Sequence, residues 1–227
     1  MSSVDDLPAP PRLYIVTDRT ATGGRPLVEV VARALEGISD SGLHAREVAV
    51  QLREKDLEGR ALTELGWALR TVTAGAGVRL FVNDRIDVAL AVDADGVHLG
   101  ASSLSPAQAR ALAPALAIAV STHGLSDVRT ARGTAAFAVY GPIRDTPSKR
   151  GYGPPLGFES LAAAAEAGLP LLAIGGIETA GVPAALAAGA HGIACIRPVM
   201  AAPDPTAAVR GLGRALASSP VASPYRT

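Results

Sequence analysis

Three polar side chains alternate at the end of the apolar segment 47–53 and just beyond it. They are Gln51, Arg53 and Lys55. In a β-strand successive side chains point to opposite faces, so these three would share one face while their apolar neighbours share the other. Inward-facing cations lose hydration unless an anion or a hydrogen-bonding ligand compensates them. The pattern indicates either an anion site or two cations neutralised by Glu54 or by acids on neighbouring strands.

An amide and a carboxylate, Asn83 and Asp84, follow the apolar segment 79–82. One such residue often caps the start of a helix. Two together beside a basic strand favour a further role. A carboxylate next to bound phosphate is a typical Mg²⁺ ligand, because Mg²⁺ takes one or two protein carboxylates and completes its shell with phosphate oxygens and water.

Two further segments could bind phosphate. Residues 141–157 are expected to form a long Gly- and Pro-containing loop with hydroxyls and a cation at Thr146, Ser148 and Lys149. Such a loop suits closure over an anion. An ordinary solvated loop would have the same composition. Gly175 and Gly176 would let backbone N–H groups approach a ligand.

Two histidines lie near predicted strands. His123 follows the segment 117–121, where an imidazole could transfer protons near neutral pH or simply cap or pack. His98 lies within a strand and is expected to line the interior of the sheet.

Eight short β-rich runs alternate with Ala- and Leu-rich helical runs, a pattern typical of repeated βα units. Eight units in this length, without a G-x-G-x-x-G turn after the first strand, predict a single α/β domain, a (β/α)8 TIM barrel. In such barrels the chemistry lies at the carboxyl ends of the strands. The predicted strands span residues 13–17, 47–53, 79–82, 96–99, 117–121, 137–140, 171–174 and 192–196, and the helices begin near residues 26, 57, 86, 105, 124, 157, 179 and 205.

The composition excludes several classes of protein. Of 227 residues 48% are hydrophobic and only 4% aromatic, while 21 Lys and Arg balance 21 Asp and Glu without a dense basic run. Neither nucleic acid nor a membrane is therefore an expected partner, and no apolar run reaches the length of a membrane helix. The single cysteine, Cys195, indicates a buried thiol in a reducing compartment, so we expect a cytoplasmic protein.

The chain divides into three parts. Residues 1–11 are acidic and Pro-rich without the features of a secretory signal, so they predict a loose leader. Residues 12–217 predict the barrel. Residues 218–227 predict a flexible tail.

Taken together, five motifs resemble the thiamine phosphate synthase family and its relative, the thiazole tautomerase. The motifs come in the family's order and cover the chain from the first strand to the last helix. They are Leu-Tyr-Ile-Val-Thr-Asp at 13–18, Gln-Leu-Arg-Glu-Lys at 51–55, Asn-Asp at 83–84, Ala-Asp-Gly-Val-His-Leu-Gly at 94–100 and Gly-Gly at 175–176.

The resemblance implies that the enzyme couples hydroxymethylpyrimidine pyrophosphate to a thiazole phosphate and releases pyrophosphate, with Asp84 ligating Mg²⁺. It implies a pyrimidine cation that the thiazole nitrogen captures, so the protein would act through charge and alignment. It places Ser121 near the pyrimidine, and the pyrophosphate against Gln51, Arg53, Lys55, Asn83 and Lys149. The thiazole phosphate would meet Thr146, Ser148 and the backbone of Gly176 and Ile196.

Two positions depart from the synthase pattern. Ser103 stands where the family has an Asp that also ligates magnesium, so the ion could bind weakly or be absent. Arg197 replaces a small hydroxyl residue and could add a phosphate contact or crowd the pocket. The serines around Ser103 are similar to the tautomerase branch, in which the histidine matching His123 does acid/base chemistry on a thiazole carboxylate phosphate. The synthase is the first interpretation, the tautomerase the second, and a non-catalytic phosphate-binding barrel the third; an oligomer is possible for each.

Overall fold

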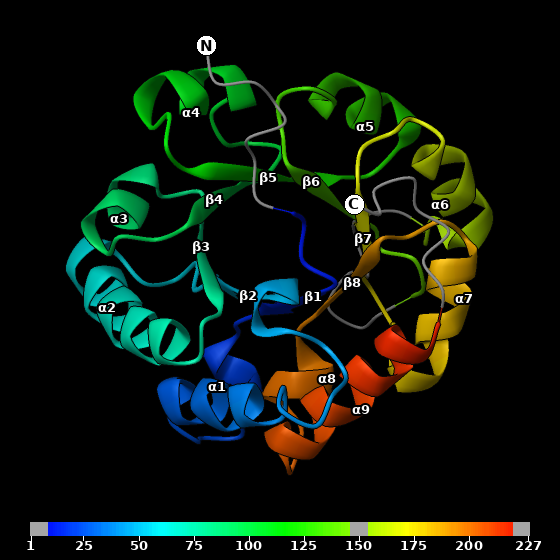
Figure 1. Ribbon diagram of the computed structural model, residues 1–227. Helices are drawn as coiled ribbons and strands as arrows, with labels where there is room; N and C mark the ends of the chain where they lie inside the picture. Colours follow the sequence, from blue (N-terminus) through cyan, green and yellow to red (C-terminus); the bar gives the residue numbers. More distant parts are fainter. Residues whose placement is uncertain (1–8, 146–153, 220–227) are drawn as a thin grey trace.

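The structure, a computed structural model, describes residues 9–145 and 154–219, and its eight parallel strands close into a barrel. Each strand pairs with the next, and β8 pairs with β1, so the sheet is a ring surrounded by helices (Figure 1). The predicted (β/α)8 barrel is confirmed, and every strand boundary lies within one residue of the prediction. The strands are β1 (Leu13–Val16), β2 (Val48–Leu52), β3 (Arg79–Asn83), β4 (Gly96–Leu99), β5 (Ala117–Thr122), β6 (Phe137–Tyr140), β7 (Leu171–Ala173) and β8 (Gly192–Cys195).

Helices follow the strands at the predicted places, with one addition. The sequence missed α8 (Arg197–Met200), because a four-residue helix shows no periodicity and contains Pro198, which the first turn tolerates. The other helices are α1 (Leu27–Glu36), α2 (Gly59–Gly75), α3 (Ile86–Ala91), α4 (Pro106–Leu112), α5 (Leu125–Ala131), α6 (Gly157–Ala165), α7 (Val182–Ala187) and α9 (Pro205–Ser218), with short 3₁₀ turns η2 (Arg19–Ala21), η3 (Ala45–Glu47) and η5 (Thr179–Gly181).

The strands divide the core into two layers. On β2, Val48, Val50 and Leu52 belong to the cluster between the barrel and its helices, whereas Ala49 belongs to a separate cluster inside the barrel. This alternation confirms the predicted two-residue period. It also sends the next inward position, Gln51, into the barrel interior.

Three aromatic rings fill the inside of the barrel. Tyr14, Phe81 and Phe137 meet edge to face, with centroids 5.3–5.6 Å apart. Gly96 makes this packing possible, because a Cβ there would lie 2.3 Å from Cε1 of Phe81. These rings form a packed floor inside the barrel.

The packed part of the chain begins before residue 12. Pro11 is buried, and the His191 Nε2 donates to the Pro10 carbonyl at 3.2 Å. Within the predicted leader of residues 1–11, these two prolines contact the barrel. Residues 1–8 and most of the predicted tail lie outside the described residues.

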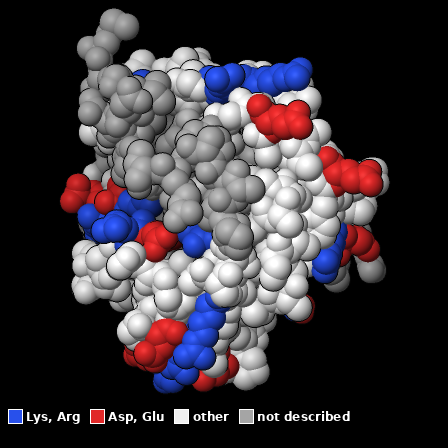
Figure 2. All heavy atoms as spheres, turned by 45° about the vertical axis from the view of Figure 1, so that its right-hand side comes forward, with Lys and Arg blue, Asp and Glu red and all other residues white. Residues whose placement is uncertain are grey.

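The protein surface carries both signs of charge side by side. On the face in Figure 2, basic and acidic side chains are interspersed, and no large area of one sign gathers there. No helix within the described ranges is long and apolar enough to cross a membrane. The free thiol of Cys195 is buried, and burial raises its pKa to about 12, which agrees with a structural role.

Candidate active site

A cavity of about 1470 Å³ opens at the carboxyl ends of the strands. Single-ligand pockets typically measure about 300–1,000 Å³, so this cavity has room for two small molecules. It brings together every predicted site residue that the structure describes: Gln51, Arg53, Lys55, Asn83, Asp84, Ser121, His123, Gly176 and Ile196. The predicted residues Thr146, Ser148 and Lys149 lie outside the described residues.

Two side-chain amides face the cavity, one at the end of β2 and one at the end of β3. Gln51 is 3% exposed, and its Nε2 donates to the Asn83 Oδ1 at 3.0 Å across the β2–β3 pair. The backbone N–H of Arg53 donates to the Thr17 Oγ1 at 2.9 Å, which ties this end of β2 to β1. These side-chain hydrogen bonds between neighbouring strand ends hold Gln51, Asn83 and the backbone of Arg53 in place.

Glu54 does not neutralise the two cations beside it, which makes that part of the alternative interpretation wrong. Its carboxylate accepts the Arg19 backbone N–H at 3.1 and 3.2 Å and lies 3.8 Å from the Arg19 Nε. Within residues 9–145 and 154–219, neither Arg53 nor Lys55 forms an ion pair. Their charges are therefore available to an anion in the cavity.

The Glu54 carboxylate is buried between β1 and β2. Burial raises the pKa of Glu54, and hydrogen bonds from the Thr17 side chain and the Arg19 amide partly oppose that rise. The carboxylate thus fastens the turn after β1 to the segment that carries Arg53. The sequence offered the neighbouring cations as one alternative partner and did not suggest Arg19, which lies 35 residues away.

Asp84 does not cap a helix, so the helix-cap interpretation is wrong for this turn. The N-cap of α3 is Arg85, without a side-chain hydrogen bond. Asp84 has φ 65°, and its N–H donates to the His98 carbonyl at 2.9 Å. A non-glycine residue in the left-handed region is uncommon and marks a constrained position. The turn holds the exposed carboxylate at the edge of the cavity.

The donors near Asp84 decide how well a magnesium ion would fit. The Ser103 Oγ accepts the Gly100 N–H at 2.8 Å, so part of its hydrogen-bonding capacity is used within its own loop. Among the described residues no group of three or more His, Cys, Asp or Glu side chains could hold a metal. One carboxylate still fits Mg²⁺ if phosphate oxygens and water supply the other ligands.

His98 lies inside the barrel, as predicted, and contacts the site through Ser121. Its Nε2 is 2.9 Å from the Ser121 Oγ. Burial, with a smaller contribution from the charge of Arg53, lowers the pKa of His98 to about 3, so the ring is neutral. Sequence reasoning gave His98 no role at the site; the signal was a polar side chain at an inward position between Val97 and Leu99.

His123 sits at the rim of the cavity with one ring nitrogen committed. Its Nδ1 is 2.6 Å from the Gly141 carbonyl, which can only accept, so Nδ1 carries a proton. Its backbone N–H donates to the Asp127 Oδ2 at 2.8 Å. In the neutral ring Nε2 is then unprotonated and could accept a proton.

The far side of the cavity is built from glycine backbone. Gly175 and Gly176 have φ 99° and 67°, and a Cβ on Gly175 would lie 2.7 Å from the Pro142 Cβ. Only glycine fits this turn, which keeps a bare peptide edge beside the cavity. Ile196 and Arg197 line the same side at the end of β8.

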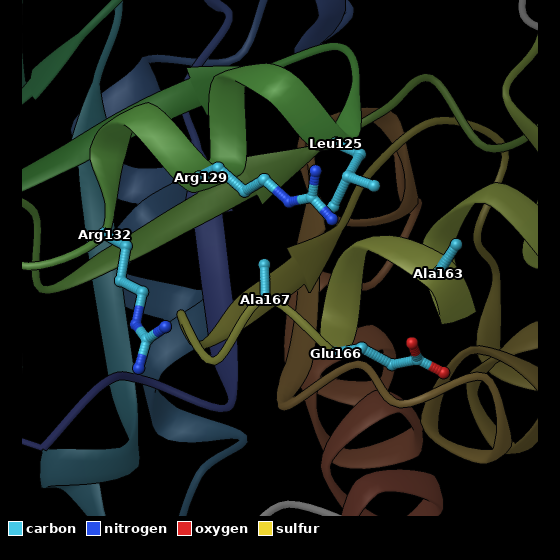
Figure 3. A pocket seen from close by; sticks show the side chains of 6 residues that line it. All are labelled: Leu125, Arg129, Arg132, Ala163, Glu166 and Ala167. Atoms are coloured by element: carbon cyan, nitrogen blue, oxygen red, sulfur yellow. The ribbon is translucent and has the colours of Figure 1, made fainter.

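A second cavity, of about 480 Å³, lies away from the strand ends. Its walls come from α5, α6 and the residues that follow them, including Arg129, Arg132 and Glu166 (Figure 3). None of the residues predicted to act on substrate lines it. The chemistry therefore belongs to the cavity at the barrel mouth.

Comparison with known proteins agrees with the geometry. The model of the thiamine monophosphate synthase family matches residues 13–199. The chain belongs to this family. Thiamine-phosphate synthases from Roseiflexus sp. and Roseiflexus castenholzii are 43% and 44% identical, over 91% and 88% of this chain and 86% of each relative. The thiamine phosphate pyrophosphorylase of Pyrococcus furiosus superposes with a TM-score of 0.79 at 35% identity, covering 90% of this chain and 95% of its own.

The left-handed conformation of Asp84 can be tested by its effect on stability. Because only glycine adopts φ 65° without a steric cost, we expect Asp84→Gly to be more stable than Asp84→Ala by about 1 kcal/mol in urea unfolding. Asp93, with φ 52° and outside the cavity lining, is the matched control and should show the same difference. Equal stability of the two residue-84 variants would contradict the left-handed turn.

Proposed function

We propose that this chain is a transferase that couples hydroxymethylpyrimidine pyrophosphate to thiazole phosphate and forms thiamine phosphate. Membership of the thiamine monophosphate synthase family supports the reaction. The observation that carries it is the pair Arg53 and Lys55, which line the cavity without a carboxylate partner among the described residues. A substrate with a pyrophosphate group supplies the missing negative charge.

The residues at and just beyond the ends of β2 and β3 would bind the leaving group. Arg53 and Lys55 would stabilise the charge that grows on pyrophosphate as its carbon–oxygen bond breaks, because the electron pair stays with the departing oxygen. Gln51 and Asn83, paired to each other at 3.0 Å, would orient the same group. We also assign Lys149 to this site, although it lies outside the described residues.

The thiazole phosphate would bind on the opposite side of the cavity. The backbone of Gly176 and Ile196 lies at the ends of β7 and β8, where barrels of this kind bind phosphate. Thr146 and Ser148 are assigned to the same phosphate from the sequence. With the thiazole nitrogen facing the pyrimidine, the carbon–oxygen bond to pyrophosphate would break first, and the nitrogen would then form the carbon–nitrogen bond with the pyrimidine cation.

We propose that Asp84 holds a magnesium ion that enters with the pyrophosphate. Such an ion would neutralise part of the phosphate charge. Asp84 fits this role because its carboxylate is exposed at the cavity and caps no helix. With Ser103 in place of a second carboxylate, the protein contributes few ligands and its affinity for the ion should be low.

A thiazole tautomerase is the second candidate, and one observation favours it. The Gly141 carbonyl accepts from the Nδ1 of His123, so in the neutral tautomer Nε2 is the nitrogen that can act as a general base. A tautomerase handles no pyrophosphate, however, and would have no use for Arg53 and Lys55. The synthase therefore accounts for more of the cavity.

The first test supplies both synthase substrates with Mg²⁺ and measures thiamine phosphate. We expect the product to form, and Arg53→Ala to lower kcat/KM by about 10²–10³-fold because a charged contact to the leaving group is lost. Arg33→Ala, an exposed arginine on α1 paired with Glu36, is the matched control and should keep full activity. If Arg53→Ala formed the product as fast as the wild type, this role of Arg53 would be ruled out.

The second test concerns the magnesium ion. Ser103→Asp adds a carboxylate to the cavity that Asp84 also lines and should lower the Mg²⁺ concentration for half-maximal activity by about tenfold, a change of about 1.4 kcal/mol. Ser102→Asp adds the same charge one position earlier and should have a smaller effect. An unchanged titration midpoint in Ser103→Asp would show that residue 103 does not face the ion.

The third test separates the synthase from the tautomerase. In a synthase His123 only orients substrate, so His123→Ala should still form thiamine phosphate at a measurable rate. In a tautomerase the wild type should interconvert the thiazole carboxylate tautomers by NMR, and His123→Ala should lose about 10²–10⁴-fold of that rate. Tautomer exchange without thiamine phosphate would overturn the proposed function.

A further inference from the structure

A line of hydrogen bonds runs from the barrel floor to the cavity through His98. This histidine is 3% exposed, and its ring stacks on Tyr14 with centroids 5.8 Å apart. The Nδ1 lies 3.4 Å from the Tyr14 hydroxyl, and the Nε2 lies 2.9 Å from the Ser121 Oγ. The three side chains come from β1, β4 and β5, so the sheet itself fixes their positions.

The Tyr14 hydroxyl decides where the His98 proton lies. Tyr14 is 0% exposed, and His98 is the hydrogen-bond partner of its hydroxyl within the described part of the chain. A buried hydroxyl proton needs an acceptor, so the Tyr14 O–H donates to Nδ1. The reverse arrangement, with a proton on Nδ1, would leave the tyrosine proton without an acceptor.

The His98 ring therefore carries its single proton on Nε2. The ring is neutral, since burial and the nearby charge of Arg53 disfavour the imidazolium. A neutral imidazole with an accepting Nδ1 is protonated on Nε2. This nitrogen then donates to the Ser121 Oγ.

Ser121 in turn must direct its own proton elsewhere. Its oxygen accepts from His98, and no other partner for this hydroxyl occurs among the described residues. Ser121 lines the cavity. The free direction for its proton is therefore toward a bound molecule.

We propose that Tyr14 and His98 are positioning residues that make Ser121 a hydrogen-bond donor toward the cavity, which selects a heteroaromatic substrate with an acceptor nitrogen at that point. The inference rests on the proposed function in one respect, the choice of the pyrimidine as that ring. A pyrimidine ring nitrogen accepts such a bond, whereas a C–H or an amino group at the same place would leave the serine proton unpaired. A neutral His98 also keeps an additional positive charge away from the pyrimidine cation.

The tautomer can be measured without any substrate. In ¹⁵N-labelled wild-type protein, long-range ¹H–¹⁵N correlations distinguish a protonated Nδ1 from a protonated Nε2, and His98→Asn assigns the signals among the four histidines. We expect His98 to be protonated on Nε2 and to show no titration between about pH 5 and 8. Protonation on Nδ1, or titration in that range, would overturn the inference whatever the enzyme's activity.

A double-mutant cycle tests the connection to substrate. Tyr14→Phe removes the hydroxyl that sets the tautomer but lies outside the cavity lining, and it should raise KM for the pyrimidine pyrophosphate roughly three- to tenfold with a smaller change in kcat. Ser121→Ala should raise KM at least as much. If the residues act in one line, the double variant should be no worse than Ser121→Ala.

An analogue with C–H in place of the acceptor nitrogen completes the test. The wild type should bind the natural ring more tightly, and Ser121→Ala should lose that preference. If Tyr14→Phe and Ser121→Ala instead raise KM by independent factors that multiply in the double variant, the connection through His98 is contradicted and Tyr14 is a packing residue. If the wild type forms no thiamine phosphate, the proposed function fails, and the wild-type NMR result still decides the tautomer.

Discussion

Two cations, Arg53 and Lys55, line the mouth of a closed barrel, and neither forms an ion pair with another described residue. They follow β2 and line the cavity, while Glu54, which lies between them in the sequence, accepts hydrogen bonds from the Arg19 backbone instead. Arg53 is half-buried and Lys55 is exposed at the rim. The guanidinium loses hydration and the two like charges repel one another, so the arrangement favours an anionic ligand. The cavity, its amides and the carboxylate of Asp84 are arranged around this requirement.

The packed floor of the barrel supports the same site. Tyr14, Phe81 and Phe137 pack against one another inside the barrel, below the cavity at its mouth. The floor is also connected to the chemistry, because Tyr14 contacts His98 and His98 contacts Ser121. Core packing and substrate orientation are therefore parts of one structure, and a change in the floor should be felt at the cavity.

The sequence predicted the fold and most of the site because both depend on local periodicity. Alternation along β2 was enough to place Gln51 inside the barrel, and the eight βα units were enough to close it. Prediction from the sequence failed where contacts between distant residues determine the conformation. Glu54 turns to Arg19 rather than to its neighbours, and Asp84 adopts a left-handed conformation whose N–H partner is on β4. The role of His98 depends on Tyr14, 84 residues away, which no local pattern reveals.

The central claim, that the cations are kept for an anion and not for stability, is tested most directly by the unfolding free energy of Arg53→Met with and without pyrophosphate. Methionine replaces the charge with apolar volume, so without anion we expect the variant to be at least as stable as the wild type. At about 100 times its Kd, pyrophosphate should stabilise the wild type by about 2.7 kcal/mol and the variant much less. A variant that is markedly less stable without anion, or equally stabilised by pyrophosphate, would contradict the account.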